Sequence, residues 1–492
     1  MMQSPALSLL AAFILAFGIR LLLLLRYYCI NNDGVIYVEI ARWLWEGDWG
    51  QAFAAYFPPM YPLLIAVVYP LVGDWEVAGQ FWPLVLGLLT IFPLYAMLKR
   101  IYNHRVASVA ILFFALSPYL VRFSLHVRNE SPYIFFLVLA LYFFQRGMER
   151  GSLWFFFTGV SASFAYLMRP EGIGMVMVGC VYLFYRVALK GGAARGLKQA
   201  LVLVTGFFLF ASPYILFLKS DTGQWAISRK GAVNVAWGMA EYDKSGLITK
   251  DSGELGALRL ITSNPSLYAK KVFIDLVRSP GVYLEALHYS YLPFLAVGWV
   301  LFFRSRFWDR EDFFLACLVL FYLVVFALLQ VNRRFAAPLI PVSLGWVAVG
   351  FLTIKDYCYK RWEKNGPMAV GLVILVFLLG TLPKGLQPIG LDKVYLRDAG
   401  IYLRDKAMDA RVFTTEGRVS FYANMPYLLV VKEPRKIPNL LKEAQADYLA
   451  VDGVTFKDIE ASYKDRGWII DKEFPGEKGE KLLVLRRVRA GQ

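Results

Sequence analysis

The 492-residue chain is too apolar for a soluble protein of its length, because 58% of it is hydrophobic, only 18% is charged, and its mean hydropathy is +0.48. The apolar residues form long blocks separated by short basic clusters, which is typical of a polytopic helical membrane protein. This pattern excludes disordered, collagen-like and disulfide-scaffold proteins.

The net charge is strongly positive, since 53 basic residues outnumber 37 acidic ones by 16. Such an excess often indicates nucleic-acid binding. Here the basic residues lie mostly at the ends of apolar blocks, where they fix topology against a membrane, so nucleic acid is not expected as a partner. The four cysteines (Cys29, Cys180, Cys317, Cys358) occur singly, without metal-type spacing, and are expected to be packing residues.

The first apolar block, residues 7–25, has neither a basic segment before it nor a small-residue cleavage site, so we expect a retained helix rather than a removed signal peptide. Ten further apolar blocks follow at about 77–98, 106–122, 131–145, 153–168, 172–188, 200–218, 284–303, 312–330, 335–354 and 367–383. Several are shorter than the usual ~20 residues of a spanning helix. We therefore predict about eleven helices, within a range of 9 to 13.

Short loops rich in Lys and Arg stay on the cytoplasmic side of a membrane. Five such loops alternate along the chain, at 99–105, 146–150, 186–198, 304–310 and 355–364. This predicts a cytoplasmic N-terminus and an outer location for the segment that begins at Lys384. The opposite loops also carry arginines, mixed with carboxylates and aromatic residues. Because positive charges there oppose the topology signal, we expect them to have another purpose.

Two polar regions interrupt the helical pattern. In residues 27–75, an amphipathic stretch at 35–45 and a Pro-rich segment at 57–62 predict helices that lie in the membrane interface and roof a cavity. From residue 384 to 492 the composition is that of a soluble protein, with short strands near 411–414, 427–431, 448–451 and 481–485 and a helix-like stretch at 437–446. The expected fold is mainly α: a transmembrane bundle over 1–383, with a long outer loop at 219–283, followed by a small α/β domain.

Asp33 follows the first apolar block directly, in the sequence Asn31-Asn32-Asp33-Gly34. At the outer surface a carboxylate can accept a proton from a hydroxyl group and orient that group for attack. The same composition also suits a plain turn or helix cap. Both interpretations remain open at this point.

Four arginines on the outer side form the other candidate sites. Arg128 lies two residues before Glu130 at the start of an apolar run, where an arginine needs a carboxylate or a phosphate as partner. Arg169 and Glu171 lie in an outer turn, and either pair could instead be a simple ion pair. Arg333 and Arg334 precede an apolar helix, which favours anion binding at the helix N-terminus.

Together these groups predict a cavity for a phosphate-bearing amphiphile and an acceptor hydroxyl. Other chemistries lack their signatures, because the chain has no GxxxxGK[ST], GxSxG or HExxH sequence. His104, His126 and His288 are too scattered for a convincing metal cluster. No cofactor and no metal site is predicted, and a requirement for a divalent metal stays open.

Several segments resemble the GT-C membrane glycosyltransferases, in the branch of the protein O-mannosyltransferases and the aminoarabinose transferase of lipid A (glycosyltransferase family 39-like). They are the first helix with Asp33, Phe-Pro-Pro-Met-Tyr-Pro-Leu-Leu at 57–64, Leu-Lys-Arg-Ile-Tyr at 98–102, the segment 116–130 and Leu-Met-Arg-Pro-Glu-Gly at 167–172. The resemblance covers roughly residues 1–190, and residues 332–341 are similar to a later helix start of the family.

The resemblance implies a donor sugar linked to polyprenyl phosphate at the outer leaflet and an inverting transfer to an acceptor hydroxyl. Asp33 matches the position of the family's catalytic base. Arg128, Arg169, Arg333 or Arg334 would neutralise the phosphate, and Tyr61, Glu130 and Glu171 are the further donor-site candidates. The sequence departs from the family pattern where Gly34 replaces a second acid and where residues 57–62 lack one.

The expected function is therefore that of a hexosyl- or pentosyltransferase of a bacterial inner membrane, acting on the periplasmic side on lipopolysaccharide, another glycolipid or a protein. The alternative is a transporter or flippase for a lipid-linked or amphiphilic solute. A transporter should show broken helices or repeated halves with polar residues at the midplane. The sequence shows no such repeat, and it has no filter-like segment that would indicate an ion channel.

Overall fold

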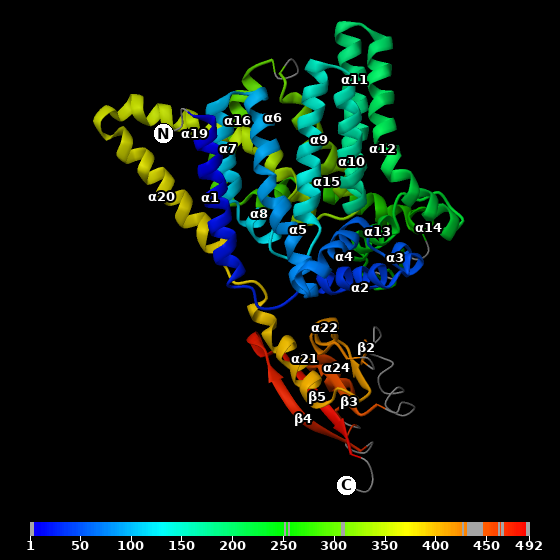
Figure 1. Cartoon of the computed structure of the whole chain (residues 1–492). Helices are drawn as coiled ribbons and strands as arrows, with labels where there is room; N and C mark the ends of the chain where they lie inside the picture. The colour runs from blue at the N-terminus through cyan, green and yellow to red at the C-terminus, as the bar shows by residue number, and fades with distance from the viewer. Residues whose placement is uncertain are drawn as a thin grey trace. The chain divides into compact units, whose positions relative to one another are not determined.

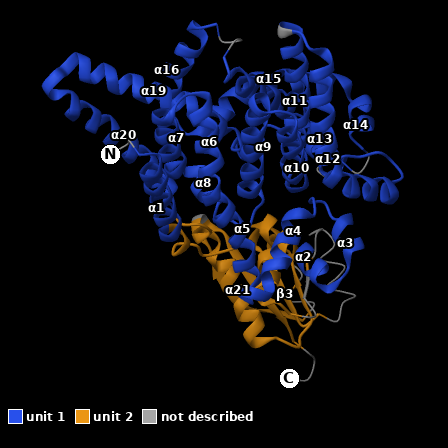
Figure 2. Ribbon diagram, turned by 45° about the horizontal axis from the view of Figure 1, so that its top comes forward, with its two compact units in different colours: residues 1–22, 40–387 blue, residues 23–39, 388–492 orange. Residues whose placement is uncertain are grey.

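The computed structural model describes residues 4–249, 252–253, 256–306, 310–425, 428–430, 446–460, 463 and 467–488. The chain divides into two compact units (Figure 2). The first comprises Met1–Leu22 and Ile40–Gln387, and the second comprises Leu23–Glu39 and Pro388–Gln492. The second unit thus takes in residues 23–39, which the sequence analysis assigned to the transmembrane part.

The first unit is helical throughout its described residues (Figure 1). Each apolar block of the sequence coincides with one or two helices, so the predicted fold class is confirmed. The helices are α1 (Pro5–Leu24), α3 (Trp49–Ala54), α4 (Met60–Val72), α5 (Trp75–Leu89), α6 (Ile91–Ile101), α7 (His104–Leu116), α8 (Pro118–Phe123), α9 (Glu130–Arg150), α10 (Leu153–Met168), α11 (Ile173–Lys190), α12 (Ala193–Thr222), α13 (Lys230–Ala240), α14 (Ala257–Ser263), α15 (Pro265–Leu287), α16 (Leu292–Arg304), α17 (Phe313–Leu328), α18 (Arg333–Ala336), α19 (Leu339–Trp362) and α20 (Gly366–Gly385).

Among the described residues, six stretches are long and apolar enough to cross a membrane, or seven if a pair bent by 88° counts as one span. Four further apolar helices, of 10–17 residues, are shorter. The bent pair joins α15 to α16 through His288, whose φ of +84° is unusual for a residue other than glycine.

Small residues let neighbouring helices of the bundle approach closely. A Cβ atom on Gly159 of α10 would lie 2.1 Å from the carbonyl oxygen of Leu203 in α12, and one on Gly206 of α12 would lie 2.3 Å from that of Phe156. Backbones this close are typical of helix packing in membranes. The contact packs α10 against α12, and Arg169 of the site described below follows α10 directly.

The loops predicted to lie on the outer side contain more helix than their polarity indicates. The predicted interfacial stretch corresponds to α2 (Asn32–Glu46), in which the division between the two units falls. The loop expected at 219–283 contains α13, α14 and most of α15, and α15 was not predicted. Two charged residues of α15 pair with each other, since the buried Lys271 lies 3.2 Å from Asp275. Lys271 also donates hydrogen bonds to the carbonyls of Ala327 (2.6 Å) and Leu329 (2.8 Å) at the end of α17.

The second unit contains the predicted small α/β domain, and its sheet is mixed. Its described strands have the order β2-β1-β3-β5-β4. β1 (Val412–Thr414) pairs in parallel with β2 (Leu428–Val430) and β3 (Tyr448–Asp452), while β5 (Lys481–Arg487) is antiparallel to β3 and to β4 (Trp468–Pro475). The helices α21 (Val394–Lys406), α22 (Gly417–Ala423) and α24 (Gly453–Ile459) accompany it. β4 was not predicted, and the helix predicted at 437–446 lies outside the described residues.

Candidate active site

Glu130 begins α9 and is completely buried. Its Oε1 atom accepts a hydrogen bond of 3.3 Å from Nη1 of Arg169 and forms an ion pair with Nε of Arg334. A carboxylate this deeply buried requires such partners, since an unpaired charge in a low-dielectric interior is very costly. Three segments that are far apart in the chain therefore meet at one carboxylate.

Arg169 follows α10 and is itself 3% exposed. Pro170 ends the helix before it, because the residue preceding a proline is biased to extended backbone, and Arg169 has a φ of −150° and a ψ of 130°. Its Nη2 atom donates to Oε1 of Glu171 over 3.1 Å. The guanidinium lies 5.0 Å from the ring centre of Phe335 and 5.6 Å from that of Tyr133, so aromatic faces and two carboxylates fix its position.

Lys230 extends this arrangement from α13, in the long loop predicted at 219–283. Its side chain is 9% exposed, and its Nζ atom lies 5.0 Å from the ring centre of Phe57 and 5.7 Å from that of Phe335. It also interacts electrostatically with Glu171. Lys230 was not among the predicted site residues, although it lies in one of the loops predicted to be outer, where positive charges are unexpected.

These residues form an alternating row of charges that we call the buried charge cluster: Lys230, Glu171, Arg169, Glu130 and Arg334. Three cations and two carboxylates leave a net charge of +1. Arg128, whose charge also acts on Glu130, raises this to +2. A net positive charge shielded from water attracts an anion such as phosphate much more strongly than the same charge at the surface does.

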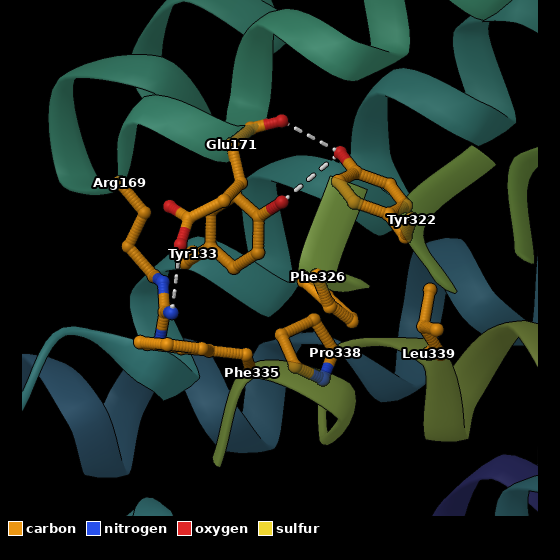
Figure 3. Close-up of a pocket in the computed structure, with 8 residues that line it drawn as sticks. All are labelled: Tyr133, Arg169, Glu171, Tyr322, Phe326, Phe335, Pro338 and Leu339. Atoms are coloured by element: carbon orange, nitrogen blue, oxygen red, sulfur yellow. Dashed lines mark hydrogen bonds and ion pairs between the residues drawn. The ribbon is translucent and has the colours of Figure 1, made fainter. Parts of the chain in front are cut away.

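A narrow pocket with a volume of about 10 Å³, room for about one water molecule, adjoins the buried charge cluster (Figure 3). Tyr322 of α17 donates a hydrogen bond to the backbone carbonyl of Glu171 over 2.8 Å. Because its single hydroxyl proton is used there, Tyr133 must donate to the Tyr322 oxygen across the 3.1 Å between them. The lining consists of Tyr133, Arg169, Glu171, Tyr322, Phe326, Phe335, Pro338 and Leu339.

Two carboxylate oxygens of the cluster lack a hydrogen-bond partner within the described part of the chain. They are Oε2 of Glu130 and Oε2 of Glu171, both buried. Buried acceptors of this kind are rare in folded proteins and call for an explanation. Each keeps the capacity to accept a hydrogen bond from a group outside the described residues.

The remaining predicted residues lie in different surroundings. Arg333 is 60% exposed on its side chain and pairs with Glu285 of α15 at 2.8 Å, so it does not share the partners of Arg334. Tyr61 is buried in α4, and its hydroxyl donates to the carbonyl of Gly79 in α5 over 2.6 Å. His126 lies near Arg128 and Arg122; burial and then these two positive charges lower the pKa of His126 well below its usual range.

Asp33 belongs to the second unit and lies in the first turn of α2, where it is half-buried. Oδ1 of the preceding Asn31 accepts a hydrogen bond of 2.9 Å from the amide of Gly34, the interaction of a helix N-cap. The capping role is therefore taken by Asn31. Across the described residues, no group of three or more His, Cys, Asp and Glu side chains could hold a metal ion.

The profile of the family described as "Dolichyl-phosphate-mannose-protein mannosyltransferase" matches residues 57–217. This segment contains Glu130, Arg169 and Glu171. An uncharacterized protein from Aquifex aeolicus is 26% identical over 129 residues, which is 26% of this chain and 26% of that protein. The match thus spans about a quarter of that curated relative.

Three solved structures share the architecture of the whole chain. The crystal structure of ArnT from Cupriavidus metallidurans bound to undecaprenyl phosphate has a TM-score of 0.61 at 14% identity, with 99% of this chain and 98% of that one covered. The oligosaccharyltransferase AglB from Archaeoglobus fulgidus, in complex with an inhibitory peptide and a dolichol-phosphate, has a TM-score of 0.53 at 13% identity, with 93% and 70% covered. The arabinofuranosyltransferase AftD from Mycobacteria has a TM-score of 0.51 at 12% identity, with 99% and 40% covered.

The chain is therefore a multi-pass membrane protein with the fold of the GT-C glycosyltransferases, and the predicted resemblance is confirmed. At these identities the structures establish the fold.

Proposed function

We propose that this protein is an integral-membrane glycosyltransferase that moves a sugar from a polyprenyl-phosphate carrier to the hydroxyl group of an acceptor on the outer face of a bacterial inner membrane. The observation that carries the proposal is the buried charge cluster, with its net positive charge and its two carboxylate oxygens that have no hydrogen-bond partner among the described residues. The family match over residues 57–217 and the fold shared with ArnT, which was solved bound to undecaprenyl phosphate, support it.

The cations suit a phosphate leaving group. When the bond between the sugar and the phosphate breaks, negative charge develops on the phosphate oxygens. Arginines and lysines that are already held in place by Glu130, Glu171 and aromatic rings stabilise this charge without reorganising. A phosphate is also a stable anion, so its departure does not require a general acid.

Asp33 would supply the base. Its carboxylate takes the proton of the acceptor hydroxyl as that oxygen attacks the anomeric carbon. The electron pair of the bond to phosphate leaves with the polyprenyl phosphate, and the attack from the opposite side inverts the configuration of the sugar. A positioned general base typically contributes about 10² to 10⁴ in rate.

The test is to reconstitute the full chain in liposomes with radiolabelled polyprenyl-phosphate sugars and outer-envelope glycolipids or peptides, and to measure the release of polyprenyl phosphate. Asp33→Asn is expected to lower turnover at least about 100-fold while donor binding is kept. The matched control is Asp48→Asn, which changes the exposed N-cap of α3. Wild-type turnover in Asp33→Asn would remove Asp33 from the mechanism, and transport of the intact donor without release of polyprenyl phosphate would favour the flippase alternative.

A further inference from the structure

The segment that carries Asp33 is part of the same compact unit as the C-terminal sheet. Residues Leu23–Glu39 group with Pro388–Gln492, although more than 300 residues separate them in the sequence. The C-terminal residues therefore contact the segment that carries Asp33 directly.

Backbone hydrogen bonds tie the two segments together. The amide of Tyr28 donates to the carbonyl of Ile389 over 2.9 Å, and the amide of Ile389 donates to the carbonyl of Arg26 over 3.0 Å. The two bonds make a parallel bridge between Tyr27 and Ile389. The bridge is the unit of a parallel sheet and fixes the register between the two segments.

Gly390 allows this close approach. Its φ is +70°, and a Cβ atom there would lie 2.5 Å from the carbonyl oxygen and 2.9 Å from the amide nitrogen of Cys29. A side chain at this position would strain the backbone and displace Cys29. Only glycine suits the junction as it is built.

Two side chains of the C-terminal domain continue the contact toward Asp33. Nη1 of Arg397, on α21, donates to the carbonyl of Tyr28 over 2.8 Å, and the hydroxyl of Tyr422, on α22, accepts from the amide of Ile30 over 2.7 Å. Cys29 and Ile30 are 2% and 1% exposed. The next residue is Asn31, which caps α2 and so places Asp33 in its first turn.

We propose that the C-terminal domain is a positioning element for the catalytic base, and that Tyr422 and Arg397 hold the segment 26–31 so that Asp33 has a fixed place. The inference rests on the proposed function of Asp33. Its physical basis is that a general base must be held within about 0.5 Å of its productive position. Tyr422 fixes a backbone amide three residues before Asp33, and Tyr422→Phe removes the hydroxyl oxygen to which this amide donates.

The experiment uses the full chain in detergent or nanodiscs and compares Tyr422→Phe with the control Tyr402→Phe, whose hydroxyl donates to Asp471 within the same domain. Hydrogen exchange at the amides of residues 27–35 is expected to rise about five- to tenfold in Tyr422→Phe and to be unchanged in Tyr402→Phe. Exchange in β3 and β5 shows whether the domain is still folded. Arg397→Met is a second variant, which leaves Tyr422 in place and is also expected to raise hydrogen exchange at residues 27–35.

Turnover provides the second measurement. In Tyr422→Phe, kcat is expected to fall about tenfold while KM for the donor changes less than twofold, because the base is displaced and the donor site is not. Unchanged hydrogen exchange at residues 27–35 in both Tyr422→Phe and Arg397→Met would show that the C-terminal domain does not anchor this segment. Raised exchange with an unchanged kcat would show that the anchoring does not position the base. Failure of the proposed function looks different: turnover would then survive Asp33→Asn, whatever the exchange rates show.

Discussion

Nη1 of Arg169 lies 3.3 Å from Oε1 of Glu130, a fully buried carboxylate 39 positions earlier in the chain. The contact joins the start of α9 to the turn after α10. Arg334 reaches the same oxygen from the start of α18, a further 165 positions beyond Arg169. One carboxylate thus determines where two cations lie, and these cations are the groups that we assign to the donor phosphate.

Glu130→Gln is expected to lower the free energy of unfolding by up to about 3–5 kcal/mol. The neutral amide no longer offsets the charge of the buried Arg169, which keeps Glu171, or that of the partly buried Arg334. The measurement is thermal or denaturant unfolding of the purified protein in detergent. The control is Glu149→Gln, which breaks the ion pair of Arg100 with a carboxylate that is 47% exposed and is expected to cost less than about 1 kcal/mol. Equal losses in both variants would show that burial of the Glu130 pair does not matter.

The helices of this fold could be predicted from the sequence because long apolar runs suffice to define them. α15 could not, since Lys271 and Asp275 interrupt its hydrophobic pattern and only the structure shows that they neutralise each other and hold the end of α17. β4 was missed for a similar reason. Its centre contains Asp471, Lys472 and Glu473, as is common in an edge strand that is protected against further pairing.

The candidate site could be predicted only in part. Sequence reasoning selected Glu130, Arg169, Glu171 and Arg334, because carboxylates and arginines beside apolar runs are costly without a purpose. It offered the neighbour Arg128 as the partner of Glu130, whereas the hydrogen bonds of Glu130 come from Arg169 and Arg334. Arg169 and Arg334 lie 39 and 204 positions after Glu130 in the chain. Tertiary packing brings them to Glu130, so no local sequence pattern indicates the contacts. The same holds for the contact between Tyr422 and Ile30.

Lys230→Met should weaken binding of the polyprenyl-phosphate donor about tenfold and leave stability nearly unchanged. The ammonium group supplies one charge to the buried charge cluster, and the methionine side chain still packs against Phe57 and Phe335. Binding of a fluorescent polyprenyl phosphate to the protein in nanodiscs measures the effect. The control is Lys244→Met at an exposed position of the same long loop. If both variants bind the lipid equally well, Lys230 does not contact the phosphate.

Tyr322→Phe should destabilise the protein by about 1–3 kcal/mol, because it removes the donor to the Glu171 carbonyl and the acceptor for Tyr133. Tyr133→Phe removes only one of these two hydrogen bonds and should cost less. The order of the two losses, measured by unfolding in the same detergent, tests the direction of the hydrogen-bond chain. A larger loss in Tyr133→Phe would contradict it.

The stability of the protein should fall as the pH drops below about 6.5, and His126 should contribute to this fall. Burial, followed by the charges of Arg128 and Arg122, lowers the pKa of His126 in the folded protein, and Glu130 offsets this only in part. Above about pH 6.5, the ring is neutral in both the folded and the unfolded states, so pH has no effect through this residue. Below that value the unfolded chain binds a proton that the folded protein excludes, and each further pH unit costs up to about 1.4 kcal/mol until the lowered pKa is reached. His126→Gln should therefore flatten the decline of Tm between pH 7.5 and 5.0, and an identical decline in the variant would show that His126 does not titrate differently on folding.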